Sequence, residues 1–250
     1  MEYATMTFWR SVIVFTALGV HRLWSSLIRP KVVNSILLPG TLVAQLGHVL
    51  GLLITGGTVD NTALIKDDES GEPQTGQDAK TRLPVVGAVI VALLPMVGCA
   101  AAIYWVSRQF GSDVLEAMTA MSVDRTALPT SLPLFFASLH RLLDLAEQLI
   151  NVIRSCNLGD WRTLLFLYLA VCLTVRMAPL TGNVRGALGA IFVTGVLCYL
   201  IDRMTKSGVG DLSSVWPLIT FSVAVLLLLL IMSLMVKGVV GLVKTCFGQG

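Results

Sequence analysis

The chain has 250 residues, of which 55% are hydrophobic and only 13% are charged, and its mean hydropathy is +0.79. Soluble globular proteins carry about 25% charged residues, so this composition excludes an ordinary soluble protein and predicts an integral membrane protein. The net charge of +3 is small and the Lys and Arg residues are scattered along the chain, which does not favour a nucleic-acid-binding protein.

Six apolar segments are predicted to cross the membrane as helices, because about 20 helical residues span the hydrocarbon core of a bilayer. The segments are 7–28, 32–55, 83–107, 161–179, 186–202 and 212–236. The second, third and sixth contain no Asp, Glu, Lys or Arg, whereas the others are shorter or include a charged residue. The expected fold is therefore all-α: a single membrane domain formed by a polytopic helical bundle of about six transmembrane helices.

Two connections between these segments are long. Residues 60–82 are rich in acidic side chains, Gly and Gln and lack apolar periodicity, which predicts a solvated and mobile polar loop. In residues 133–156, Leu and Ile recur at helical spacing opposite charged and amide side chains, which predicts an amphipathic helix. Because its polar face mixes acids and bases, packing against the bundle is favoured over lying on an anionic membrane surface.

Residues that mark helix starts and reactive groups add little to the functional picture. Asn157 and Asp160 precede the fourth segment, where their side-chain oxygens are expected to cap free backbone N–H groups. The five cysteines occur singly, which favours buried thiols over disulfides or a thiolate metal site. Serine hydrolysis would require Ser35 or Ser222 beside His48 on another helix, and no nucleophile motif favours it.

The stretch LPGTLVAQLGHVLGLLITGG, residues 38–57, has the spacing of a zinc-peptidase helix. Such a helix places two histidines at positions i and i+4, where they share one face, with a glutamate beside the first to activate a zinc-bound water. Aligned on that pattern, Ala44, Gln45 and His48 occupy the positions of the first histidine, the glutamate and the second histidine. Alanine has no ligand atom, and a neutral amide does not act as the base.

The context of these positions resembles the site-2-protease-type intramembrane zinc metallopeptidases, which carry the pattern PG-x-x-x-H-E-x-x-H followed by T-G at the helix end. Residues 160–192 are similar to the later helix and loop of that superfamily, in which an aspartate after a proline supplies the third metal ligand. On this alignment Asn183, after Pro179, occupies the aspartate position. The resemblance covers roughly residues 32–201 and implies a degenerate, catalytically inactive member.

The resemblance implies a site with no metal, no other cofactor and no catalytic residue. Its degenerate metal-site positions are Ala44, Gln45, His48 and Asn183. Amides in place of carboxylates avoid the cost of an ionised group in an apolar bundle that lacks its cation. The helix of His48 is expected to pack on the loop of Asn183, and His48 itself is interpreted as a neutral side chain hydrogen-bonded inside the bundle. Three glycines are predicted to allow this close packing: Gly47, Gly51 and Gly186.

The predicted function is that of a non-catalytic integral membrane protein with a degenerate metallopeptidase core, acting as a scaffolding, binding or regulatory subunit. Its expected partners are the lipid bilayer and other membrane-protein subunits, and its expected location is a bacterial inner membrane. The alternative is a small-molecule or ion transporter or channel component, which would use Arg176 and Asp202, because ionisable groups at membrane depth mark pathways. For both residues we favour a side chain that extends to the membrane interface.

Overall fold

The computed structural model describes residues 2–56, 86–111, 114, 132–177 and 216–246, and all structural statements concern these residues. Within them the chain is all-helical. The helices are α1 (Glu2–Leu27), α2 (Pro30–Ile36), α3 (Leu38–Ile54), α4 (Val86–Phe110), α6 (Leu132–Ser155), α7 (Trp161–Val175) and α9 (Trp216–Cys246). The predicted polar loop 60–82 and the predicted span 186–202 lie outside the described residues.

Two described helices are long and apolar enough to cross a membrane, namely Val89–Phe110 within α4 and Leu218–Val243 within α9. A third candidate arises if α2 and α3 together count as one span. Shorter apolar helices cover Ser11–Leu27 and Trp161–Val175. The described residues thus contain two or three candidate spans, which is compatible with a membrane protein but fewer than the six predicted from the sequence.

The segment predicted as one continuous span, 32–55, consists of two helices that meet at an angle of 78°. The break falls at Leu37, two residues before Pro39, because a proline inside a helix lacks an N–H donor and its ring collides with the preceding turn. At this break the carbonyl oxygen of Ile36 accepts a hydrogen bond from the Tyr168 hydroxyl at 2.8 Å and one from the Cys172 thiol at 3.5 Å. Side chains of α7 therefore satisfy the backbone at the break, as an apolar environment requires.

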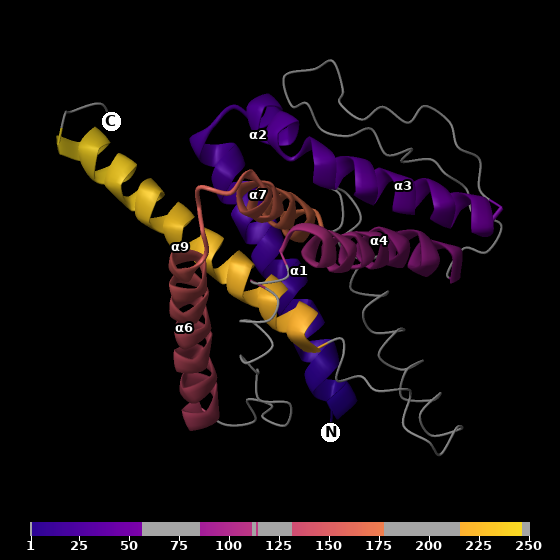
Figure 1. The fold of residues 1–250 in the computed structure, drawn as a ribbon, viewed down its shortest axis with the longest axis horizontal. Coiled ribbons are helices and arrows are strands. Elements are labelled where there is room, and N and C mark those ends of the chain that lie inside the picture. The colour runs from indigo at the N-terminus through magenta and orange to yellow at the C-terminus, as the bar shows by residue number, and fades with distance from the viewer. Residues whose placement is uncertain (1, 57–85, 112–113, 115–131, 178–215, 247–250) are drawn as a thin grey trace.

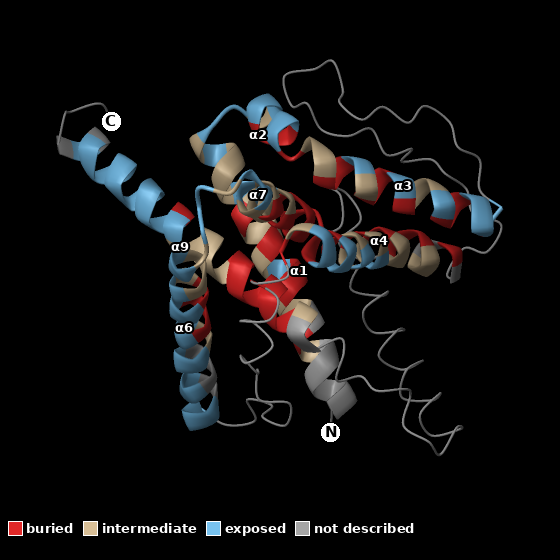
Figure 2. Ribbon diagram, in the orientation of Figure 1, coloured by how far each residue is buried: buried red, intermediate tan, exposed pale blue. Residues whose placement is uncertain are grey.

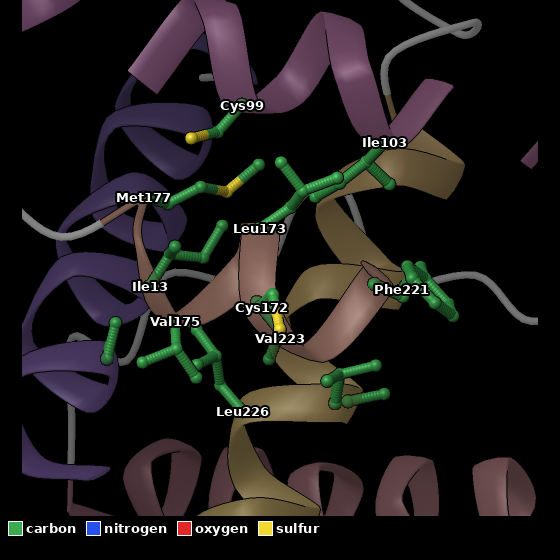
Figure 3. Close-up of a cluster of buried hydrophobic side chains, with 14 of the residues drawn as sticks. Ile13, Cys99, Ile103, Cys172, Leu173, Val175, Met177, Phe221, Val223 and Leu226 are labelled. Carbon is green, nitrogen blue, oxygen red and sulfur yellow. The ribbon is translucent and has the colours of Figure 1, made fainter. Parts of the chain in front are cut away.

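The helices pack as two pairs joined by α7 (Figure 1). α1 and α9 cross near the middle of the molecule, while α3 and α4 lie side by side in opposite directions. α7 contacts α1, α3, α4 and α9. Its buried residue Leu173 shares a core with Ile13 of α1, Ile103 of α4 and Leu226 of α9 (Figure 3).

The predicted amphipathic helix 133–156 corresponds to α6, which packs against α9. Its buried side chains are Leu145, Ala146 and Leu149, whereas Asp144 and Glu147 are exposed. α6 thus packs against the bundle through these three residues, while Leu134 and Leu143 of the predicted apolar face are exposed. Figure 2 shows the consequence: buried residues follow the inner faces of the helices, and the outer face of α6 is exposed.

The predicted cap of α7 is confirmed for Asp160 but not for Asn157. A side-chain oxygen of Asp160 accepts a hydrogen bond from the backbone N–H of Arg162 at 3.0 Å. Asn157 instead uses its side-chain oxygen to accept a bond from the N–H of Gly159, also at 3.0 Å, inside the preceding turn. The cap fixes the residue at which α7 begins. Tyr168 and Cys172, further along the same helix, then reach the break between α2 and α3.

Candidate functional site

One face of α3 is made of small residues and lies directly on the backbone of α4. A Cβ atom added at Gly47 would lie 2.7 Å from the Cα of Pro95, and one added at Gly51 would lie 2.8 Å from the Cα of Val91. Real Cβ atoms do not approach backbone atoms that closely, so both positions require glycine. These two predicted packing glycines therefore face α4, and the third, Gly186, lies outside the described residues.

Beside the glycine face, α3 carries a polar stripe formed by Thr41, Gln45, His48 and Thr55. Residues three, four or seven apart share one side of a helix, so these side chains, with Thr55 at the C-cap of α3, lie in a row. The Thr41 hydroxyl donates to the Leu37 carbonyl at 3.0 Å. The Thr55 hydroxyl donates to the Gly51 carbonyl at 2.8 Å. Both hydroxyls are therefore satisfied within their own helix.

Gln45 and His48 contrast with the two threonines. Gln45 is only 5% exposed, and among the described residues neither its Oε1 nor its Nε2 atom has a hydrogen-bond partner. His48 is half-buried, and in the same part of the chain its buried Nε2 atom also lacks a partner. A buried polar group without a partner costs about 1–3 kcal/mol. The polar stripe therefore contains two side chains, one helical turn apart, with buried polar atoms that lack hydrogen-bond partners among the described residues.

The residues of this stripe do not fit a zinc ion. Tight zinc sites use three or four imidazole, thiolate or carboxylate ligands. Ala44 has no ligand atom and is fully buried in the hydrophobic core, Gln45 carries a neutral amide, and only His48 could coordinate. The described residues include no group of three or more His, Cys, Asp or Glu side chains that could hold a metal ion. Asn183 lies outside the described residues, so its approach to His48 stays a prediction.

A second polar cluster joins α1, α2 and α7 next to the break between α2 and α3. Arg176 caps the C-terminus of α7, is 6% exposed, and donates from Nη2 to Oδ1 of the buried Asn34 at 2.6 Å. Nε2 of His21 lies 3.3 Å from the same oxygen. Because that oxygen only accepts hydrogen bonds, the His21 contact is a hydrogen bond in the tautomer that carries its proton on Nε2.

The guanidinium of Arg176 is buried and bonds to Asn34 inside the bundle, whereas its expected position at the membrane interface stays a prediction. Asp202, for which the same expectation was made, lies outside the described residues. Sequence reasoning also missed Asn34 and Tyr168. The available signal was Asn34 itself, an amide within a predicted span, because polar side chains at membrane depth are usually paired. Its partner is 142 residues away, which local patterns do not reveal.

The remaining candidate residues are two serines and the cysteines. The hydroxyls of Ser35 and Ser222 donate to carbonyls of their own helices, at Lys31 and Leu218. Among the described cysteines, Cys99 and Cys172 are buried thiols and Cys156 is half-buried, and none of the three forms a disulfide. The prediction of buried thiols thus holds for Cys99 and Cys172, and the two remaining cysteines lie outside the described side chains.

Comparison with known proteins adds no assignment. No family model matches the chain, no curated protein matches it, and no solved structure matches it.

Proposed function

We propose that this chain is a non-catalytic, multi-pass membrane protein with a degenerate core of the site-2-protease type, acting as a scaffolding, binding or regulatory subunit. The observation that carries the proposal is the residue at position 44. Ala44 stands where the pattern needs a histidine, it is 0% exposed, and it belongs to the packed core. The adjacent stripe then offers one imidazole, on His48, and an amide in place of a carboxylate base.

The exposed half of α9 supports a role in binding other membrane proteins. Residues 218–226 of α9 are largely buried, whereas residues from Leu234 to Val243 are exposed and, apart from Lys237, apolar. Added Cβ atoms at Gly238 and Gly241 would meet nothing within 4 Å, so this mainly apolar half has open space beside two glycines. Small residues on membrane helices favour close helix packing, which makes this half suited to a neighbouring helix in the bilayer. About six spans and a bacterial inner membrane are part of the same proposal.

Elemental analysis of protein purified in detergent without chelator tests the non-catalytic part. We expect zinc far below one ion per chain, because a lone imidazole and a neutral amide do not supply the charged ligands of tight sites. The His48→Ala variant should have the same zinc content as the wild type. About one zinc per wild-type chain, lost in His48→Ala, would overturn the proposal.

Site-specific photo-crosslinking in native membranes tests the subunit part. A photoreactive side chain at Leu242, which is 68% exposed, should form protein adducts of discrete mass. The matched control is Leu226 on the same helix, which is 0% exposed and should give none. Adducts with lipid alone at Leu242 would contradict a subunit role.

The cluster of Arg176 and Asn34 favours a second candidate, a transporter or channel component. Buried ionisable residues and broken membrane helices line many transport pathways, and this cluster lies beside the break between α2 and α3. Chloride efflux from KCl-loaded proteoliposomes separates the two candidates. The subunit proposal expects no efflux above that of empty liposomes. Protein-dependent efflux that Arg176→Gln abolishes, and that the exposed control Arg108→Gln leaves unchanged, would replace the subunit proposal with the transporter.

A further inference from the structure

We propose that Gln45 and His48 together bind one small neutral molecule that both donates and accepts hydrogen bonds, water being the smallest member of that class. The proposal rests on the two unsatisfied side chains of the α3 stripe. It does not depend on the subunit function, because a transporter or an enzyme with the same stripe would contain the same unsatisfied polar atoms.

The unmet atoms define the chemistry of the ligand. The Gln45 amide presents donors at Nε2 and an acceptor at Oε1, and all of these are buried without a partner among the described residues. A cation would satisfy only the oxygen, and an anion would satisfy only the nitrogen. Nε2 of His48 donates or accepts according to its tautomer, so it adapts to either end of the ligand. A neutral donor and acceptor therefore fits both residues.

The helix geometry limits the size of the ligand. Side chains three positions apart on a helix have Cβ atoms about 5–6 Å apart. One water with hydrogen bonds of about 2.8–3.0 Å to each side chain bridges such a separation. Ala44 and Leu52 of the same helix are 0% and 2% exposed, so the polar spot is small and has apolar neighbours on its helix.

Thermal unfolding of the full chain in detergent micelles tests whether the site is occupied. If a ligand satisfies Gln45, the near-isosteric Gln45→Leu should lower the melting temperature by about 3–6 °C, because the ligand's hydrogen bonds are lost. Combining it with His48→Leu should lower the temperature little further, since both changes remove the same ligand. Thr41→Val is the matched control, because its hydroxyl is bonded within α3. A higher melting temperature for Gln45→Leu, or additive shifts, would overturn the proposal.

Nuclear magnetic resonance of ¹⁵N-glutamine-labelled protein identifies the source of the ligand. The Gln45 side-chain signal is assigned by its loss in Gln45→Leu. A nuclear Overhauser effect from its NH₂ protons to the water line identifies bound water. No such effect, together with a wild-type melting temperature that falls on exhaustive dialysis, identifies an organic solute. If neither result is obtained, the proposal fails whatever the sign of the thermal shift.

Discussion

Arg176 shows how a single side chain keeps a charge inside an apolar bundle. Its position after the last residue of α7 leaves the guanidinium beside α2, where the Asn34 amide oxygen accepts its hydrogen bond. A guanidinium does not lose its proton at physiological pH, so the charge has to be solvated by the protein itself. Asn34 is therefore a structural partner whose loss leaves a buried charge less well solvated.

Replacing Asn34 by Ala should destabilise the protein by about 1.5–3 kcal/mol, the value for hydrogen bonds to charged groups. Chemical unfolding in detergent, followed by circular dichroism, measures the loss. The adjacent Ser35 is exposed, and Ser35→Ala should change stability by less than about 0.5 kcal/mol. Equal effects of the two substitutions would mean that Asn34 does not solvate Arg176 in the folded protein.

At the scale of elements, α3 is positioned by glycines on one side and by α7 at its start. Gly40 lies against the Cys172 carbonyl group of α7, where an added Cβ would be 2.6 Å from the carbonyl carbon. Gly47 and Gly51 then bring the same helix onto α4. With little side-chain volume between them, the helices are held by backbone contact, which makes their spacing sensitive to a single methyl group.

Gly47→Ala and Gly51→Ala should each destabilise the protein by about 1–3 kcal/mol, because the new methyl group forces α3 and α4 apart. Gly98 is the matched control in the same helix pair, since an added Cβ there would lie 3.8 Å from Val43, an ordinary contact. Gly98→Ala should be neutral or stabilising by up to about 1 kcal/mol through helix propensity. Thermal unfolding of the three variants checks this order, and a loss at Gly98 equal to that at Gly47 would contradict the backbone contact.

At the scale of the whole molecule, one side-chain hydrogen bond links the first and last described helices, which also pack through the core. The indole Nε1 of Trp24 donates to Oγ of Ser233 at 2.7 Å, joining α1 to α9 across 209 positions of the chain. Ser233 is 5% exposed, whereas the residues that follow it in α9 are exposed. The bond therefore lies at the point where α9 leaves the bundle.

Trp24→Phe should keep the ring packing but remove this bond, with a loss of about 1 kcal/mol in unfolding free energy. Far-ultraviolet circular dichroism is the suitable measurement, since it does not depend on tryptophan fluorescence. Trp105 of α4 is 61% exposed, and Trp105→Phe serves as the control with no expected loss. Similar losses in both variants would show that the α1–α9 contact does not depend on the indole nitrogen.

Local chemistry explains which features were predictable. The helix α6, bounded at Leu132 and Ser155, follows from apolar side chains at helical spacing, and the Asp160 cap follows from the affinity of a carboxylate for free N–H groups. The bend at Leu37 was predictable in principle from Pro39, but the length of the apolar run suggested a continuous span. The relation between His48 and Asn183 stays a prediction, because Asn183 is outside the described residues.

The sequence by itself determined the all-helical, apolar character of the chain and the identity of the side chains at positions 44, 45 and 48, because composition and spacing are properties of the chain alone. Only the tertiary structure decided the burial and the hydrogen-bond partners of the polar and small side chains. It buried Ala44 in the core, left the Gln45 amide without a partner among the described residues, and paired Arg176 with Asn34. The physical reason is that hydrogen-bond satisfaction depends on neighbours from other helices, and these are set by the 78° bend and the glycine contacts.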